Sequence, residues 1–577
     1  MTDKKHVIQI IEELAVLLEL KGANPFKIRA FQNAARSLQN LDADIGELVR
    51  SGKLTGIKGI GKSIADLIGE ILSTGKSSDL ERLKDEIPPG VTEMLKIPGM
   101  GAKKVKAVWE KLGITTIGEL EYACKENRLV DLEGFGAKTQ EKILSGIDLL
   151  RKYSDRHLLS KTLPAAEKLV EQLCDHRAVV RCEITGELRR FCETIRQIDI
   201  LVSAEFQQAR FVVEYFCALP EVDYAPEKTL DSALIVLENG IKARLRVVDE
   251  KQFALALLHS TGSAAHLKKL QQLAAETGVE IGEKVLPESN SGNHSFASEP
   301  VIYQKLNLQS IEPELREDRG EIEAARQNRL PHLVTPDNLK GVIHVHTRYS
   351  DGANTIAEMA QTCKKQGYQY LVVSDHSKTA VYANGLSEEH ILEQHREIEQ
   401  LNAEMENFTI LKSIECDILP DGSLDYSDSV LTSFDLVIGS IHSKLKMSPE
   451  EATRRILRAM ENPYLTILGH PTGRLLLARE GYPVDMHRII EAAAELGVAI
   501  ELNANPHRLD IDWRLLREAT ERGVKISINP DAHRVDGIND IRYGIGIARK
   551  GWLSANDVLN CLSAQELTTF AKKRRNQ

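Results

Sequence analysis

The sequence lacks two features that would each define a class of protein. No apolar run approaches the roughly 18 residues of a membrane span, and the start, MTDKKHVIQIIEELAVLLEL, is typical of an amphipathic helix rather than a signal peptide. The eight cysteines form no Cys-x-x-Cys pair, which argues against both a zinc ribbon and a disulfide framework. We therefore expect a cytoplasmic protein with reduced thiols and no membrane partner.

The chain also lacks the basic excess that holds many proteins on nucleic acid. Its 74 Lys and Arg stand against 84 Asp and Glu, which gives a net charge of −10. At 577 residues it is long enough for several domains. Residues 1–150 are balanced, with 22 basic and 22 acidic side chains. Any DNA binding there must use placed backbone amides.

Three similar units in residues 1–150 provide such amides. They are LTGIKGIGKSIADLI from Leu54, LKIPGMGAKKVKAVW from Leu95 and LEGFGAKTQEKIL from Leu132. Each resembles a helix-hairpin-helix, in which glycines let a phosphate approach the amino end of the second helix. A plain helical turn with a glycine cap would explain one copy, but three copies that each precede a lysine favour DNA binding. The candidate DNA-binding residues are Gly59, Gly61, Lys62, Gly99, Gly101, Lys103, Gly134, Gly136 and Lys138.

Residues 1–325 resemble the DNA polymerase X family. The motifs that carry this resemblance are TGELRRFCETIRQIDILVSA at 185–204, KARLRVV at 242–248 and HSTGS at 259–263. It implies helix-hairpin-helix domains at 1–85 and 86–152, an α+β nucleotidyltransferase-like palm at 153–252, a thumb at 253–325 and a linker at 326–338. A polar stretch at 286–300 is expected to form an exposed loop.

The polymerase site departs from the family pattern. Family members hold two Mg²⁺ ions with three carboxylates, but here the three positions are Gln197, Asp199 and Arg244. A guanidinium in that cleft repels Mg²⁺, so polymerase activity is expected to be lost. Glu187 and Glu193 remain candidate substitutes, and Arg189 and Arg190 remain candidate phosphate ligands.

Residues 339–577 contain seven apolar runs that alternate with helical stretches, which predicts a parallel (β/α) barrel. Potential metal ligands stand at or just beyond the carboxyl end of these runs, the face on which such barrels build active sites. One isolated histidine would be unremarkable, but nine ligands in this arrangement indicate a metal centre. They are His344, His346, Asp351, His376, Glu415, His442, His470, Asp531 and His533.

This half resembles the PHP domain (polymerase and histidinol phosphatase), which implies a seven-stranded barrel with three divalent ions. In the implied arrangement one ion is held by His344, His346, Glu415 and Asp531, a second by Glu415, His442 and His470, and a third by Asp351, His376 and His533. Imidazole and carboxylate without thiolate suit Mn²⁺, Zn²⁺ or Fe²⁺. Such ions would activate a water for hydrolysis. Arg474 and Arg508 are candidates to hold the phosphate, and Asn503 to orient a ligand.

The sequence thus predicts a DNA repair protein whose barrel hydrolyses DNA 3′ ends, as a 3′–5′ exonuclease or 3′-end phosphoesterase. The expected partner is gapped, nicked or 3′-recessed duplex DNA, bound by a monomer without sequence preference. Three alternatives stay open: a working gap-filling polymerase with an associated exonuclease, a non-catalytic DNA-binding scaffold, and a small-molecule phosphatase.

Overall fold

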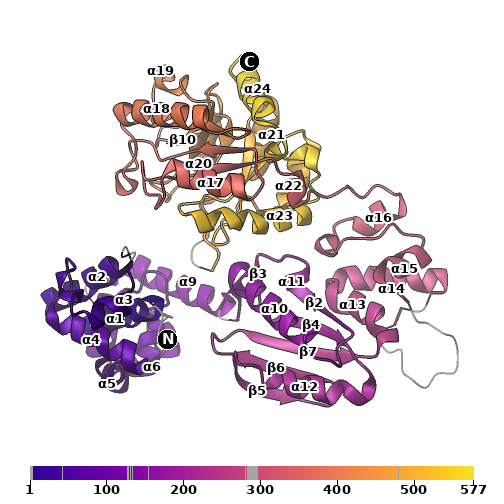
Figure 1. Cartoon of the computed structure of the whole chain (residues 1–577), viewed down its shortest axis with the longest axis horizontal. Helices are drawn as coiled ribbons and strands as arrows, with labels where there is room; N and C mark the ends of the chain where they lie inside the picture. Colours follow the sequence, from indigo (N-terminus) through magenta and orange to yellow (C-terminus); the bar gives the residue numbers. More distant parts are fainter. Residues whose placement is uncertain are drawn as a thin grey trace. The chain divides into compact units, whose positions relative to one another are not determined.

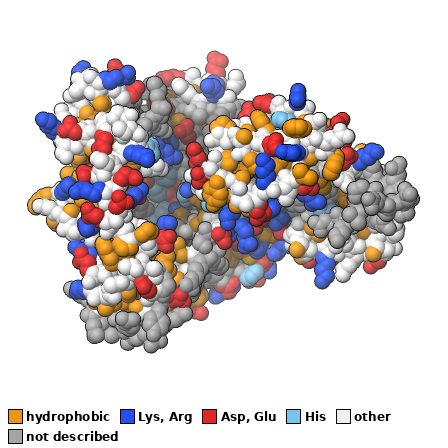
Figure 2. All heavy atoms as spheres, turned by 90° about the horizontal axis from the view of Figure 1, so that it is seen from below, with side chains coloured by type: hydrophobic (Ala, Val, Ile, Leu, Met, Phe, Trp, Pro, Cys, Tyr) orange, Lys and Arg blue, Asp and Glu red, His pale blue; other side chains and the backbone are white. Residues whose placement is uncertain are grey.

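The computed structural model divides the chain into two compact units, Met1–Asp155 and Arg156–Gln577 (Figure 1). The structure describes residues 4–39, 41, 43–125, 129, 132, 134–153, 155–279, 281–282, 296–477 and 480–576. Among them, no helix is both long and apolar enough to span a bilayer. Figure 2 shows acidic and basic side chains interspersed over the face it presents, as expected for a chain without a general basic field.

The first unit is helical. In α1 the apolar side chains recur every three or four residues, and Val7, Ile11, Leu14 and Leu18 are buried against the neighbouring helices. A short 3₁₀ turn, Leu54–Gly56, precedes the first hairpin. The helices are α1 (Lys4–Leu20), α2 (Pro25–Gln39), α3 (Ile45–Arg50), α4 (Lys62–Thr74), α5 (Ser78–Glu86), α6 (Pro89–Met94), α7 (Ala102–Leu112), α8 (Ile117–Lys125) and α9 (Ala137–Tyr153).

The second unit begins with a five-stranded sheet in the order β2-β4-β7-β6-β5. The strands are β2 (Arg181–Thr185), β4 (Ile198–Ser203), β5 (Val222–Lys228), β6 (Ser232–Leu237) and β7 (Lys242–Val248), with a separate pair β1 (His157–Leu158) and β3 (Thr194–Ile195). Helices α10 (Leu159–Cys174) and α12 (Ala209–Cys217) pack on the sheet, and α11 (Gly186–Arg189) follows β2. This is the palm-like part.

The thumb-like part that follows is helical, with α13 (Phe253–Thr261), α14 (Ala264–Thr277), α15 (Glu299–Lys305) and α16 (Glu321–Arg326). Most of the polar stretch expected to be an exposed loop, residues 286–295, lies outside the described residues. The expectation is wrong for Phe296 and Glu299, which are buried, and α15 begins at Glu299.

The predicted barrel is confirmed. Seven parallel strands follow one another in sequence order, and a bridge between Val345 and Ala532 brings the two edges together. The strands are β8 (Gly341–Val345), β9 (Tyr370–Val373), β10 (Thr409–Asp417), β11 (Leu436–Ser440), β12 (Ile467–Leu468), β13 (Ala499–Asn503) and β14 (Ile526–Asn529). The helices are α17 (Ile356–Lys365), α18 (Glu388–Glu404), α19 (Asp428–Leu431), α20 (Pro449–Met460), α21 (Met486–Leu496), α22 (Trp513–Glu521), α23 (Ile541–Lys550) and α24 (Ala564–Arg575). Buried Leu567 and Ala571 of α24 pack with strand residues, and Arg575 bonds the backbone just before β11, so α24 lies at the amino ends of the strands.

Within the second unit the palm-like, thumb-like and barrel parts share contacts. Glu317 of the thumb accepts hydrogen bonds from Arg190 of the palm, at 2.9 Å, and from Lys550 of the barrel. Arg189 likewise pairs with Glu299 at 2.7 Å, so both arginines have carboxylate partners within the unit, and their role as phosphate ligands stays a prediction. The expected linker is also packed, because its buried Val334 donates its backbone N–H to Leu553 of the barrel.

Candidate metal centre

All nine predicted ligands come together at the carboxyl ends of the barrel strands, around Glu415 of β10. The Glu415 carboxylate lies 2.9 Å from His376 Nδ1, 3.0 Å from His470 Nε2, 3.2 Å from His442 Nε2, 3.5 Å from His344 Nε2 and 3.6 Å from His346 Nε2. Five imidazoles thus surround one buried carboxylate. Parallel strands explain this convergence, because their carboxyl ends meet on one face of the barrel.

Three overlapping groups of these side chains are compact enough to hold an ion each. They are His344, His346 and Asp531; His376, Glu415 and His442; and His346, Asp351, His376 and His533. The groups resemble the expected division but differ from it in two ways: Glu415 belongs to one group rather than two, and His346 and His376 each belong to two. His470 is in none of the three, although its Nε2 is 3.0 Å from Glu415.

The residues fit divalent cations. His346 is fully buried, yet neither of its ring nitrogens has a hydrogen-bond partner among the described residues, which is costly unless another group binds them. Burial lowers the pKa of His346 to about 3, so its imidazole is neutral, the form that binds metal. Burial alone would lower the pKa of His442, but the Glu415 and Asp417 carboxylates raise it to about 10. These carboxylates stabilise positive charge where a cation would sit.

Two carboxylates that the sequence analysis missed orient the ligands. Glu501 of β13 accepts a hydrogen bond from His344 Nδ1 at 2.5 Å, and Asp417 accepts one from His442 Nδ1 at 2.6 Å. Each bond fixes the tautomer and turns Nε2 toward the centre. A signal was present, because both acids stand inside apolar strands, in SIECDI and VAIELN, where an unpaired charge would be expensive.

The backbone is strained at two ligands. His344 and Asp531 have φ of +67° and +53°, a region that side-chain-bearing residues rarely adopt. The register of β8 against β9 shifts between Val342 and Val345, so His344 stands in an irregular stretch of the strand. Such strain persists only where the surrounding structure holds it, and it often marks functional sites.

The two candidate phosphate ligands differ in their surroundings. Arg508 lies at the centre, with Nε 3.6 Å from Asp531 Oδ2. Arg474 instead donates to the backbone oxygens of Arg508 and Leu509 and to Glu193 of the palm, at 2.7 Å for the last bond. Arg474 thus stabilises the loop that contains Arg508 and Leu509. Asn503 donates to Glu501 and Asp531, at 3.1 and 3.2 Å, and so bridges two of the buried acids.

The polymerase-like site keeps one carboxylate. Gln197 donates to Asp199 at 2.6 Å, and Arg244 is the register partner of Asp199 on β7. Burial raises the pKa of Asp199 although Gln197 and Arg244 oppose the shift. The candidate substitutes each pair with an arginine, Glu187 with Arg156 at 3.0 Å and Glu193 with Arg474, although the Glu187 carboxylate also raises the pKa of Asp199.

The three hairpins share one turn geometry. Gly59, Gly99 and Gly134 have φ of +92°, +86° and +83°, and the second glycine of each pair directly precedes α4, α7 or α9. Gly61 and Gly101 have ordinary negative φ, and a Cβ on either would meet no atom within 4 Å. Neither the backbone nor packing within the unit therefore demands glycine there. The lysines after the turns, Lys62, Lys103 and Lys138, are exposed.

Comparisons with known proteins agree with these elements. A helix-hairpin-helix domain model matches residues 2–77, a SAM-like helix-hairpin-helix tandem 91–148, a DNA polymerase beta thumb 256–317 and a PHP domain 343–505. The barrel resembles probable phosphatases from Caldanaerobacter subterraneus, at 30% identity over 170 residues, and Thermoanaerobacter sp. X514, at 32% over 166 residues. Each alignment covers 28% of this chain and 60% or 62% of the relative.

The fold and the ring of strand-end ligands define a metal-dependent hydrolase of the PHP type joined to DNA-binding hairpins and a polymerase-like thumb. Over the whole chain, a protein of Bacillus subtilis strain 168 called DNA polymerase/3′-5′ exonuclease PolX is 38% identical across 573 residues, 99% of each chain. The chain belongs to the PolX family, with a C-terminal PHP domain.

Proposed function

We propose that this protein is a metal-dependent DNA 3′–5′ exonuclease and 3′-end phosphoesterase that acts through the barrel, with polymerase activity lost. One observation carries the proposal: the barrel gathers five imidazoles around Glu415, whereas the polymerase-like triad retains only Asp199. The name of the Bacillus relative, which includes a 3′-5′ exonuclease, supports the same reaction class.

The nine ligands would hold three divalent ions, Mn²⁺, Zn²⁺ or Fe²⁺ by the chemistry of the donor set. When bound, such ions supply a nucleophilic water at neutral pH and neutralise charge on the phosphate oxygens. The side chains of the protein would orient the ligands and the phosphate. Glu501 and Asp417 hold His344 and His442 in the tautomer that points Nε2 at the centre. Arg508, beside Asp531, binds a phosphate oxygen.

The hairpins would hold the DNA, bound by a monomer at gapped, nicked or 3′-recessed sites. Gly61 and Gly101 support this, because a glycine that nothing inside the unit requires leaves room for a phosphate against the backbone. Such contacts carry no sequence information, which suits a protein that acts on ends rather than on a particular sequence.

Paired substitutions at the centre test the proposal. His344→Ala with Asp531→Ala should reduce the Mn²⁺-dependent release of nucleotides from a 3′-labelled, 3′-recessed duplex at least 100-fold. The matched control is His487→Ala with Asp428→Ala, which removes one imidazole and one carboxylate from the exposed surface of the barrel. Equal rates in the parent and the ligand variant would disprove the site.

A working polymerase is the second candidate, favoured by the name of the Bacillus relative. Primer extension on a one-nucleotide gap with Mg²⁺ or Mn²⁺ separates the two, since we expect no incorporation by the parent chain. Incorporation that is abolished by Asp199→Asn would instead establish the polymerase. The phosphatase relatives suggest one further comparison, in which hydrolysis of p-nitrophenyl phosphate should be much slower than attack on DNA ends.

A further inference from the structure

The loops after β10 and β11, together with one face of α20, form a groove that has no role in the site described above. Its volume is about 400 Å³. We call it the basic groove, because five cationic side chains and two carboxylates line it. These are Lys444, Lys446, Arg454, Arg455 and Arg458, with Asp421 and Glu451.

The charge of the basic groove is available to a ligand. Lys444, Lys446 and Arg454 are exposed, and none forms an ion pair with any residue in the described part of the chain. The two carboxylates are engaged locally: Glu451 accepts the backbone N–H of Ser448 at 2.8 Å, and Asp421 accepts from the backbone and hydroxyl of Ser423 at 3.0 and 2.7 Å. A concentrated positive surface is unexpected on a chain of net charge −10, and an anion would be attracted to it.

The groove is preorganised by a buried arginine. Arg455 donates to the backbone oxygen of Leu419 at 2.9 Å, to that of Ser443 at 3.1 Å and to that of Ile418. One side chain therefore ties the loop after β10 to the loop after β11 and to α20. Because Arg455 is used in this way, the free cations beside it are held on a fixed backbone, which reduces the entropic cost of binding.

The basic groove shares the loop after β11 with the metal centre. Lys444 is two residues beyond His442, whose Nε2 is 3.2 Å from Glu415. Lys446 and Met447 also line a second pocket of about 600 Å³, which is bounded by Gly473 and Tyr482 of the loop that follows His470. Tyr482 donates its hydroxyl to Pro471 at 2.7 Å. Two loops that carry candidate ligands thus form the walls of these pockets.

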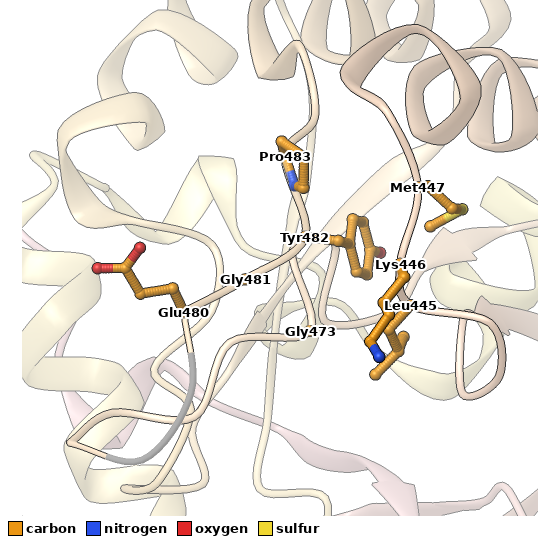
Figure 3. A pocket seen from close by; sticks show the side chains of 8 residues that line it. All are labelled: Leu445, Lys446, Met447, Gly473, Glu480, Gly481, Tyr482 and Pro483. Carbon is orange, nitrogen blue, oxygen red and sulfur yellow. The ribbon is translucent and has the colours of Figure 1, made fainter. Parts of the chain in front are cut away.

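The second pocket, the apolar pocket, presents mainly carbon. Figure 3 shows the Tyr482 side chain directed toward Leu445 and Lys446, with Met447 and Pro483 nearby, while the Glu480 carboxylate points away from them. An apolar pocket beside a cationic groove matches the two parts of a nucleotide, a flat base and an anionic backbone. Proteins that bind single strands without sequence preference use this combination.

We propose that the basic groove and the apolar pocket together bind the single DNA strand that enters the metal centre, with backbone phosphates on Lys444, Lys446 and Arg454 and a base in the apolar pocket. This rests on the proposed function, because it takes the strand to be the substrate of the same site. It extends that function, because the single strand would be bound by the barrel itself. The helix-hairpin-helix unit would not be needed for this contact.

A charge-removal variant of the full-length protein tests the groove, with Lys444→Gln, Lys446→Gln and Arg454→Gln combined. The matched control removes three exposed charges from the opposite end of the barrel, with Lys365→Gln, Lys572→Gln and Lys573→Gln. Binding of a fluorescent hexathymidylate in EDTA is measured by anisotropy from 50 to 300 mM salt. Hydrolysis of a 3′-overhang oligonucleotide and of bis(p-nitrophenyl) phosphate follows with Mn²⁺.

We expect the groove variant to bind hexathymidylate at least tenfold more weakly than the parent at 50 mM salt, and the control to match the parent. The slope of log affinity against log salt should fall by about 2, because each lost phosphate contact on a single strand contributes roughly 0.7. The variant should also lose far more of its kcat/KM on the oligonucleotide than on the small diester. Equal affinity and slope in variant and parent would overturn the groove, whatever the hydrolysis rates. Weaker binding by the variant, together with a parent that hydrolyses neither substrate, would support the groove while refuting the proposed function.

Discussion

Glu501 offers the sharpest test of the metal centre, because it contacts the ligands without being one. Its Oε1 accepts from His344 Nδ1 at 2.5 Å and from Asn529 at 2.7 Å, and its Oε2 accepts from the His470 backbone at 2.6 Å and from Asn503 at 3.1 Å. The side chain is fully buried. Glu501→Gln keeps the shape but turns one oxygen into a donor, so two of the four bonds are lost in either orientation of the amide.

The expected cost follows from these bonds. Loss of a partner that orients a metal-binding histidine typically weakens metal affinity 10- to 100-fold, or about 1.4 to 2.7 kcal/mol. Both orientations of the amide disturb a ligand, because one faces His344 Nδ1 and the other the backbone of His470. We therefore expect the upper end of the range, with Mn²⁺ affinity about 100-fold below that of the parent.

Competition with a calibrated chelator measures this affinity, and the rate on 3′-labelled DNA is followed over the same Mn²⁺ series. The nuclease rate should recover partly at high Mn²⁺, because the ligands themselves remain. Glu495→Gln, an exposed acid on α21, is the control and should match the parent. An affinity within threefold of the parent for Glu501→Gln would refute the reasoning that this carboxylate orients the centre.

Three further predictions concern stability. Glu317→Ala should destabilise the second unit by about 3 to 5 kcal/mol in urea, because Lys550, with 1% of its side chain exposed, and Arg190 both lose their carboxylate partner. Adding Lys550→Met should recover part of the loss, and a cost of Glu317→Ala below about 1 kcal/mol would contradict this reasoning. Burial raises the pKa of Asp540 to about 6, so its stabilising protonated form is lost as pH rises from 4 to 7, and Asp540→Asn should raise the melting temperature at pH 7.5 but not at pH 4. Mn²⁺ at 100 times its Kd should stabilise chelator-treated protein by about 2.7 kcal/mol, an effect that His346→Ala should greatly reduce.

The sequence predicted what depends on strand ends. In a parallel barrel each strand's carboxyl end faces the same side, so His376, His442 and His470 could be placed together before their distances were known. The turns of the hairpins were predictable for a similar reason, since the glycine spacing is local. The residues that support the centre were harder to find, because Glu501 reaches His344 across 157 positions of sequence.

The sequence predicted least well what depends on how parts of the second unit meet. A guanidinium beside a glycine turn suggests a phosphate ligand, and nothing local distinguishes that role from a structural one. Arg474 is held by Glu193, which is 281 residues away, and Arg190 by Glu317, 127 residues away. In the same way, residues 326–338 were predicted to be a linker between thumb and barrel, yet Val334 is buried against the barrel.

Both the side chains beside Asp199 and the contacts with the barrel stabilise the palm. Gln197 donates to Asp199 at 2.6 Å and Arg244 lowers the pKa of Asp199, so both side chains stabilise this carboxylate without a metal ion. The contacts between palm and barrel impose a different constraint. Phe191 packs so closely on the barrel that a Cβ at Gly546 would lie 1.9 Å from its ring. Glu193 accepts a hydrogen bond from Arg474, which also donates to the backbone oxygen of Arg508. Loss of the palm would therefore remove Glu193 from Arg474 and leave it with partners in the barrel alone, Asp512 and the backbone oxygens of Arg508 and Leu509.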